Sequence, residues 1–267
     1  MFEITLKFLA AVQKNNSTEW LHTYRDLYQQ EKKRFSDFVE SLLTEFQKIN
    51  PELEWQKPKD CIYRFNKDIR FSKDKKPYKE NFWANFSSWG KKAWAPCFYF
   101  HLQPWDKSFI TAGVYRPSQQ DENRVRAYLL MHFDERDAFL SDKKINKYFH
   151  FDEAYHQYKT PARLWSLIAN NPEIRENLSP MLAEYWISKD YWTSVVKHDS
   201  KKAESILKQL AYYKDWSFTH PLTDEDVKSP KLYNEVLNAY KLIYPVIDFF
   251  EKAYAWPEYV WFIKKSK

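Results

Sequence analysis

Glycine is nearly absent from this sequence of 267 residues, which contains only Gly90 and Gly113. Phosphate-binding loops and dinucleotide-binding turns need several glycines, because their backbones approach the phosphate groups closely. A serine hydrolase elbow likewise needs a glycine on each side of its serine. The sequence therefore excludes these three kinds of active site.

Cysteines and long apolar runs are also scarce. Cys61 and Cys97 allow one disulfide at most, and their spacing fits neither a disulfide framework nor a zinc site. No apolar run approaches the ~18 residues that a membrane span needs, and Glu3 and Lys7 interrupt the short apolar run at the N-terminus. We therefore expect a cytoplasmic protein that makes no contact with a membrane.

Metal and cofactor motifs are missing as well. The seven histidines are scattered, and the nearest approach to a metal-ligand spacing is Glu153 with His156, which lacks a third ligand. We therefore expect no metal site and no cofactor.

Aromatic residues, in contrast, are abundant. They make up 19% of the sequence and include 12 Trp, while 44% of all residues are hydrophobic and 29% are charged. This composition is typical of a folded chain with bulky core packing. The net charge of +6 permits an anionic partner without requiring one.

Apolar residues at spacings of three and four predict helices at residues 5–14, 17–31 and 32–49, with Asn16 as a cap and an end at Asn50 and Pro51. A further helix is predicted after Pro117, capped by Ser118. Helices are also expected at about 200–212 and, after Pro230, to about 254. The Trp- and Tyr-rich residues 142–198 indicate a mixture of short helices, loops and a strand.

The hydrophobic period changes to two between these helical regions. Strands are predicted from Cys61 to Phe71, Tyr78 to Phe86, Cys97 to Gln103 and Ser108 to Tyr115. Four successive strands without helices between them favour an antiparallel sheet. The expected fold is α+β, with a sheet at about residues 61–115 covered on one face by N- and C-terminal helices. We expect a single compact domain over 1–267, helical at 5–49, β-rich at 61–115 and mainly helical at 118–254.

The densest charge lies in RFNKDIRFSKDKKPYK, residues 64–79, which we call the basic hairpin. It contains seven cations and two carboxylates. Strand alternation places Arg64, Asn66, Asp68 and Arg70 on one face and the apolar residues on the other. A strand held by its apolar face presents fixed cations, which suits anion binding. The candidate anion-binding residues are Arg64, Lys67, Arg70, Lys73, Lys75 and Lys79.

Two carboxylates and a tyrosine in the basic hairpin are candidate catalytic residues. Asp68 and Asp74 either orient a neighbouring cation or act as a general base, and Tyr78 either donates a proton or packs. The alternative is a solvated hairpin whose charges pair with one another, each exposed pair contributing only ~0.2–1 kcal/mol. The sequence leaves open whether the protein is an enzyme.

The basic hairpin also resembles the signature of a bacterial and fungal conserved-hypothetical family, a domain of unknown function, with the pattern RxxRDxRFSKDKxPYK. Lys67 stands where an arginine is usual, which keeps the charge but loses the planar fork. The segments NNSTEWLHTYRDLY, PCFYFHLQP, AGVYRP and HPLTDEDVKSPKLY extend the resemblance from about residue 5 to 253. The resemblance implies no known activity, but it makes the charged block the hallmark of the family.

Three functions compete for these residues. The first is binding, with or without turnover, of an anionic, phosphate-bearing small molecule, with Arg64, Asp68 and Arg70 facing a common concavity. The second is a nucleic-acid-binding module in which exposed Trp83, Trp89 and Trp94 stack on bases. The third is a scaffold for a partner protein, in which the charged face is a flat contact surface.

Overall fold

The computed structural model describes residues 1–70, 73–91, 94–151 and 215–255. The helix predicted at about 200–212 and the pair Glu153 and His156 lie outside these residues, as does most of 142–198. The helices and strands, in chain order, are α1 (Glu3–Lys14), α2 (Thr18–Thr23), α3 (Arg25–Ile49), the 3-10 helix η1 (Pro51–Leu53), α4 (Pro58–Cys61), β1 (Phe82–Phe86), β2 (Cys97–Leu102), β3 (Ser108–Val114), α5 (Gln119–Met131), α6 (Phe133–Leu140), α7 (Lys143–Tyr148), β4 (His150–Phe151), β5 (Trp216–Leu222), α13 (Asp224–Lys228) and α14 (Leu232–Ala255).

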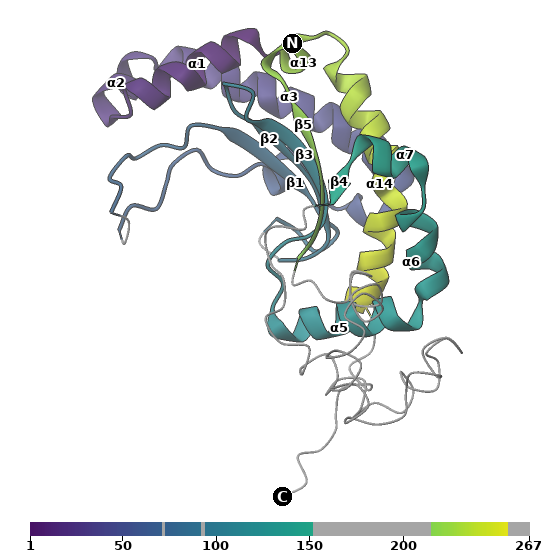
Figure 1. The fold of residues 1–267 in the computed structure, drawn as a ribbon. Coiled ribbons are helices and arrows are strands. Elements are labelled where there is room, and N and C mark those ends of the chain that lie inside the picture. The colour runs from purple at the N-terminus through teal and green to yellow at the C-terminus, as the bar shows by residue number, and fades with distance from the viewer. Residues whose placement is uncertain (71–72, 92–93, 152–214, 256–267) are drawn as a thin grey trace, which may run out of the picture.

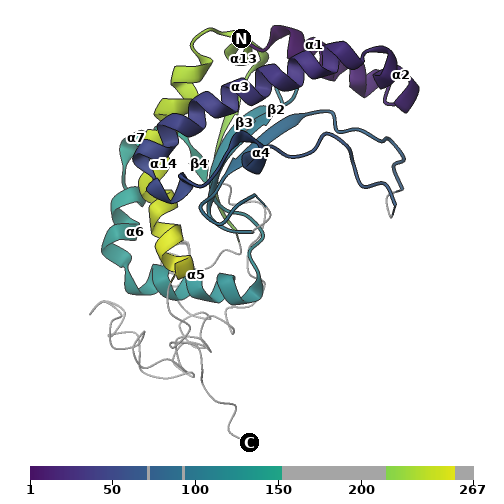
Figure 2. The ribbon, with the colours of Figure 1, turned by 180° about the vertical axis from the view of Figure 1, so that it is seen from behind.

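The fold is α+β, as the sequence predicted. Five strands form one sheet in the order β1-β2-β3-β5-β4, and every neighbouring pair is antiparallel. Helices α1, α3 and α14 lie on one face of this sheet, which Figures 1 and 2 show from opposite sides. N- and C-terminal helices thus cover the same face.

The covered face of the sheet forms the core together with these helices. Phe86 and Phe98 point toward α3 and α14 and are fully buried, as strand alternation requires. The ring of Phe46 on α3 lies 3.7 Å from that of Tyr240 on α14 and makes edge contacts with both phenylalanines. Stacked and edge-to-face rings therefore join two helices to two strands.

The boundaries of the sheet differ from the expected residues 61–115. Among the described residues, 61–81 contain only the isolated bridges Ile62 to Ala84 and Asn66 to Tyr78, and Cys61 ends helix α4. The prolyl ring of Pro58 favours a helix start, and the Asp60 carboxylate accepts a hydrogen bond from the backbone N–H of Lys57. The sheet is completed instead by β4 and β5, which come later in the chain.

Two details of the N-terminal helices also differ from expectation. The predicted helix 17–31 is broken at Tyr24, where α2 ends and α3 begins. Asn16 does not cap α2; the hydroxyl of Ser17 does, accepting a hydrogen bond from the N–H of Trp20 at 3.1 Å. The cap at Ser118 is confirmed, since its hydroxyl accepts from the N–H of Asp121.

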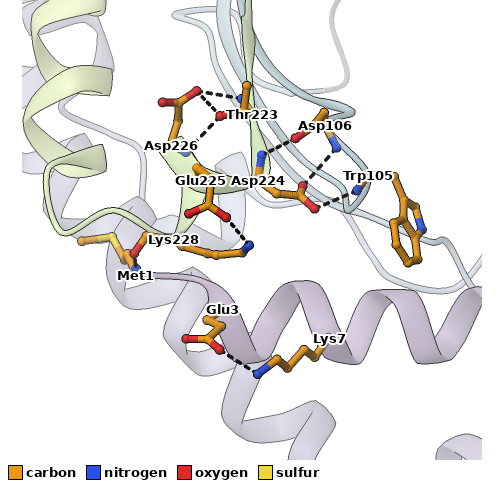
Figure 3. Close-up of polar contacts among 10 residues, drawn as sticks. All are labelled: Met1, Glu3, Lys7, Trp105, Asp106, Thr223, Asp224, Glu225, Asp226 and Lys228. Carbon is orange, nitrogen blue, oxygen red and sulfur yellow. Dashed lines mark hydrogen bonds and ion pairs between the residues drawn. The ribbon is translucent and has the colours of Figure 1, made fainter.

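A reciprocal contact joins the turn between β2 and β3 to the start of α13 (Figure 3). The carboxylate of Asp224 accepts hydrogen bonds from the backbone N–H groups of Trp105 and Asp106, both at 3.1 Å. The carboxylate of Asp106 accepts from the N–H of Asp224 at 2.6 Å. Trp105 and Asp106 have positive φ angles of 72° and 53°, so this contact also holds two residues in left-handed geometry.

Candidate functional site

The basic hairpin extends from the β1 edge of the sheet, on the same side of the molecule as α2 (Figures 1 and 2). Its two arms are joined by a bond from the N–H of Lys67 to the carbonyl of Pro77 at 2.8 Å. A second bond runs from the N–H of Lys79 to the carbonyl of Phe65 at 3.0 Å. These bonds flank the bridge between Asn66 and Tyr78, so the hairpin is an extended arm and not a regular strand pair.

Aromatic packing anchors the base of the basic hairpin to the N-terminal helices. Phe65 is buried and lies 5.5 Å from Tyr78, 5.1 Å from Tyr28 and 6.1 Å from Phe8, measured between ring centroids. The side-chain amide of Asn16 donates to the carbonyl of Tyr78 and accepts from its N–H, both at 3.0 Å. The base of the hairpin is therefore fixed by packing and by polar contacts.

The outer part of the basic hairpin carries two exposed ion pairs. The guanidinium of Arg70 binds the carboxylate of Asp68 through two bonds, at 2.6 and 3.0 Å. The ammonium of Lys67 lies 3.2 Å from a carboxylate oxygen of Asp74. Each carboxylate also accepts a bond from a backbone N–H two residues ahead, which stabilises the local turn.

These contacts determine the electrostatics of the two candidate acids. The hydrogen bond from Arg70 lowers the pKa of Asp68, and the positive charge of Arg64 lowers it further. The backbone N–H of Lys76 and the ammonium of Lys67 lower the pKa of Asp74. Both carboxylates orient neighbouring cations, and a lowered pKa makes each of them a weaker base.

The third catalytic candidate, Tyr78, is buried against Phe65. Its backbone is tied to Asn16, so its observed contacts are those of an anchor.

The remaining predicted cations lie at the surface. Arg64, Lys73 and Lys75 are exposed, and the Lys75 ammonium donates to the carbonyl of Ile69 at 3.1 Å. We expected Arg64, Asp68 and Arg70 to face a common concavity, but all three are exposed. The hairpin extends away from the sheet (Figure 1), which is consistent with this exposure.

Lys79 lies in a different environment at the base of the hairpin. Its ammonium donates to the carbonyl of Arg64 at 2.7 Å and lies 4.1 Å from the ring centroid of Trp83 and 5.8 Å from that of Tyr63. The side chain is partly buried. Burial, together with the charge of Arg64, lowers the pKa of Lys79 to about 8.

Trp83 belongs to a column of rings on the sheet face opposite the helices. Its ring stacks on His101 of β2 with centroids 5.8 Å apart, and His101 stacks on Phe109 of β3 at 4.7 Å. The imidazole is held between the Tyr99 hydroxyl at 3.1 Å and the side-chain amide oxygen Oε1 of Gln103 at 2.8 Å, and burial lowers its pKa. The column fixes the Trp83 ring beneath Lys79.

Sequence reasoning had identified Lys79 but missed Trp83 and Tyr63 as its neighbours. The position of Trp83 could have been predicted from the sequence, since alternation along β1 places its side chain on the other face of the sheet from the buried Phe82 and Ala84. Tyr63 could not be placed, because the strand assumed for its segment does not form.

Over residues 1–70, 73–91, 94–151 and 215–255 there is no group of three or more His, Cys, Asp or Glu side chains arranged to hold a metal ion. Within the same ranges, no helix combines the length and apolar character needed to cross a bilayer. Cys61 and Cys97 are both free thiols.

The fold and the hairpin together define an α+β protein in which a charged arm extends from the edge of an antiparallel sheet that has helices on one face. The family described as "Conserved hypothetical protein (DUF2461)" matches residues 4–249, and the chain belongs to that family. Comparison with curated proteins and with solved structures gave no match.

Proposed function

We propose that the protein binds a phosphate-bearing or similar small anion at the base of the basic hairpin, between Arg64 and Lys79. The observation that carries this proposal is a pair of neighbouring cations, neither of which forms an ion pair with any residue that the structure describes. Among the described residues, no carboxylate lies within ion-pair distance of either side chain, and the charge of Arg64 acts directly on Lys79. An anion between them offsets this repulsion.

The rest of the hairpin strengthens the attraction for an anion. Its seven cations and two carboxylates leave a net charge of 7 − 2 = +5 in sixteen residues. Asp68 and Asp74 form ion pairs with Arg70 and Lys67, at the outer part of the hairpin. The base therefore keeps its positive potential, and the guanidinium of Arg64 supplies the planar fork that a phosphate or carboxylate accepts.

A cytoplasmic location is part of this proposal. Two free thiols suit a reducing compartment, where small phosphate-bearing metabolites are available.

A nucleic acid is the second candidate partner, and the extended shape of the hairpin favours it. An exposed arm with Lys73 and Lys75 near its end suits a polyanionic backbone better than a single small molecule. Trp89 and Trp94 are exposed and available for stacking on bases, whereas Trp83 is occupied in the ring column.

Thermal unfolding with and without phosphate tests the first candidate. We expect phosphate or sulfate to raise the Tm of the parent protein relative to chloride at equal ionic strength. Arg64→Met should keep the Tm measured in chloride and lose the phosphate-dependent rise. Arg25→Met, which removes an exposed arginine at the start of α3, is the matched control and should keep that rise. A parent protein that phosphate does not stabilise would contradict the proposal.

Salt dependence separates the two candidates. Binding of a single-stranded oligonucleotide through several phosphates weakens by orders of magnitude between ~50 and ~200 mM salt. Binding of a small anion at one pair of cations has a much shallower salt slope. Tight, steeply salt-dependent oligonucleotide binding that Lys73→Met and Lys75→Met weaken would favour the nucleic acid.

A further inference from the structure

Lys79 differs from the other lysines of the basic hairpin in what it touches. Lys67 pairs with Asp74 at 3.2 Å and Lys76 with Glu80 at 3.1 Å, while Lys73 and Lys75 are exposed. Lys79 is partly buried, and its ammonium contacts a carbonyl oxygen and two aromatic rings. Within the described part of the chain it has no carboxylate partner.

The contacts of Lys79 act in two directions: the Trp83 ring and the carbonyl of Arg64 stabilise the ammonium form, whereas partial burial and the charge of Arg64 destabilise it. Burial and the neighbouring positive charge of Arg64 both oppose protonation, and the pKa of Lys79 is lowered to about 8. At pH 7 roughly one such side chain in ten carries a free amine, compared with fewer than about one in a thousand for an ordinary lysine. A free amine is a nucleophile, whereas an ammonium group is not.

We propose that Lys79 is a nucleophilic lysine that forms a protonated imine with an aldehyde or ketone whose own phosphate or carboxylate is bound by Arg64. This inference rests on the proposed anion site and names its ligand class as an anionic carbonyl compound. The Lys79 ammonium donates to the backbone carbonyl of Arg64 at 2.7 Å, and the charge of the Arg64 side chain opposes protonation of Lys79, so the two residues are neighbours at the base of the hairpin.

The chemistry balances without a further reactant. The amine nitrogen adds to the carbonyl carbon, the carbonyl oxygen takes up two protons and leaves as water, and a C=N bond forms. Ammonium plus carbonyl compound thus gives iminium plus water, so the positive charge stays on the nitrogen. The Trp83 ring, 4.1 Å from that nitrogen, stabilises the iminium cation as it does the ammonium group. One N–H remains to donate to the carbonyl of Arg64.

Two probes test the inference on the intact parent protein: pyridoxal 5′-phosphate, an aldehyde with a phosphate, and pyridoxal, the same aldehyde without it. Brief exposure is followed by borohydride reduction, which fixes each imine as a secondary amine, and by peptide mass spectrometry. We expect the phosphate-bearing aldehyde at pH 7.5 to label Lys79 at least ~10-fold faster than Lys73 or Lys75. Pyridoxal should show a several-fold smaller preference.

Two further readouts distinguish a reactive lysine from a merely structural one. The labelling rate at Lys79 should level off above pH about 8, while the rate at Lys73 continues to rise with the free-amine fraction of an ordinary lysine. Arg64→Met should reduce labelling by the phosphate-bearing aldehyde to the level of pyridoxal. Labelling by pyridoxal should fall much less, and only because the Lys79 amine loses a neighbouring positive charge that opposes its protonation.

The outcomes separate this inference from the proposed function. Labelling of Lys79 no faster than Lys73 by either aldehyde overturns the inference, and a phosphate-dependent rise in Tm in the same protein would leave the anion site standing. Equal labelling by both aldehydes, unaffected by Arg64→Met, overturns the anionic class of ligand and the anion site together. The parent protein alone gives the first result, so a variant that fails to fold does not obscure it.

Discussion

The helix-covered face of the sheet and the basic hairpin are held in place by different forces. On the covered face, Phe46, Phe86 and Phe98 are fully buried and contact one another directly. Among the described residues of the hairpin, only Phe65 and Tyr78 are buried, and most of the charged side chains are exposed. Stability therefore resides mainly in the covered face, and charged groups available to a ligand are concentrated in the hairpin.

The largest loss of stability is expected from a substitution in the core on the helix-covered face. Phe46→Ala removes a ring that touches two strands and α14, and we expect it to lower the free energy of unfolding by about 3–5 kcal/mol. Denaturant unfolding measures this change. Trp94→Ala is the control, because that side chain is 60% exposed, and it should cost less than about 0.5 kcal/mol. Similar losses in both variants would contradict the contrast between the core and the exposed surface.

A smaller effect is expected where the hairpin meets the helices. Asn16→Ala removes both hydrogen bonds to the backbone of Tyr78 and should lower the free energy of unfolding by about 1–2 kcal/mol. Amide exchange at Tyr78 should accelerate in this variant. Asn15→Ala is the matched control, since the Asn15 amide donates only to Ala11 within its own helix end. Unchanged exchange at Tyr78 would show that packing of Phe65 alone holds the hairpin.

A further, pH-dependent effect on stability is expected from Lys79 at the base of the hairpin. Its folded pKa of about 8 lies below its ordinary value of 10.5, so the unfolded chain binds more protons between these two pH values. Stability from this group is therefore lowest below pH about 8 and rises as the pH increases toward 10.5. We expect this rise in the parent protein and a smaller one in Lys79→Met, measured as denaturation midpoints across that range. If the midpoints of the two proteins changed with pH in parallel, the lowered pKa of Lys79 would be contradicted.

The smallest expected effect lies at the outer ion pair of the hairpin. Asp68→Asn breaks the pair with Arg70, but both groups are solvated, so the Tm should stay within experimental error of the parent value. Any small stabilisation by this pair depends on pH, because the pKa of Asp68 is lowered in the folded protein. The stabilisation is present above the ordinary aspartate pKa and is lost as the pH falls through the pKa of the folded state. A marked decrease in Tm would instead show that Asp68 stabilises the folded structure.

The sequence predicted local features better than distant ones. The period-two pattern located β2 and β3, and the cap at Ser118 was correct, because alternation and capping depend on adjacent residues. The pairing of β3 with β5 was missed, since β5 lies far along the chain and its pattern is disrupted by His220 and Pro221. At the site, the cations of the hairpin were predicted, while the Trp83 ring beneath Lys79 emerged only from the contacts of the folded chain.

The strand order also means that β3 is synthesised on the ribosome well before β5, the strand with which it pairs. The hydroxyl of Thr111 on β3 bonds to the carbonyl of Phe218 on β5, 107 residues later. At about 5–20 residues per second, the β3 edge waits for its partner strand for roughly 5–20 s after its own synthesis. During that interval its unpaired backbone groups are a template for wrong pairing with other chains. Slow translation or a shortage of chaperones should therefore harm the yield of this protein before it harms its final stability.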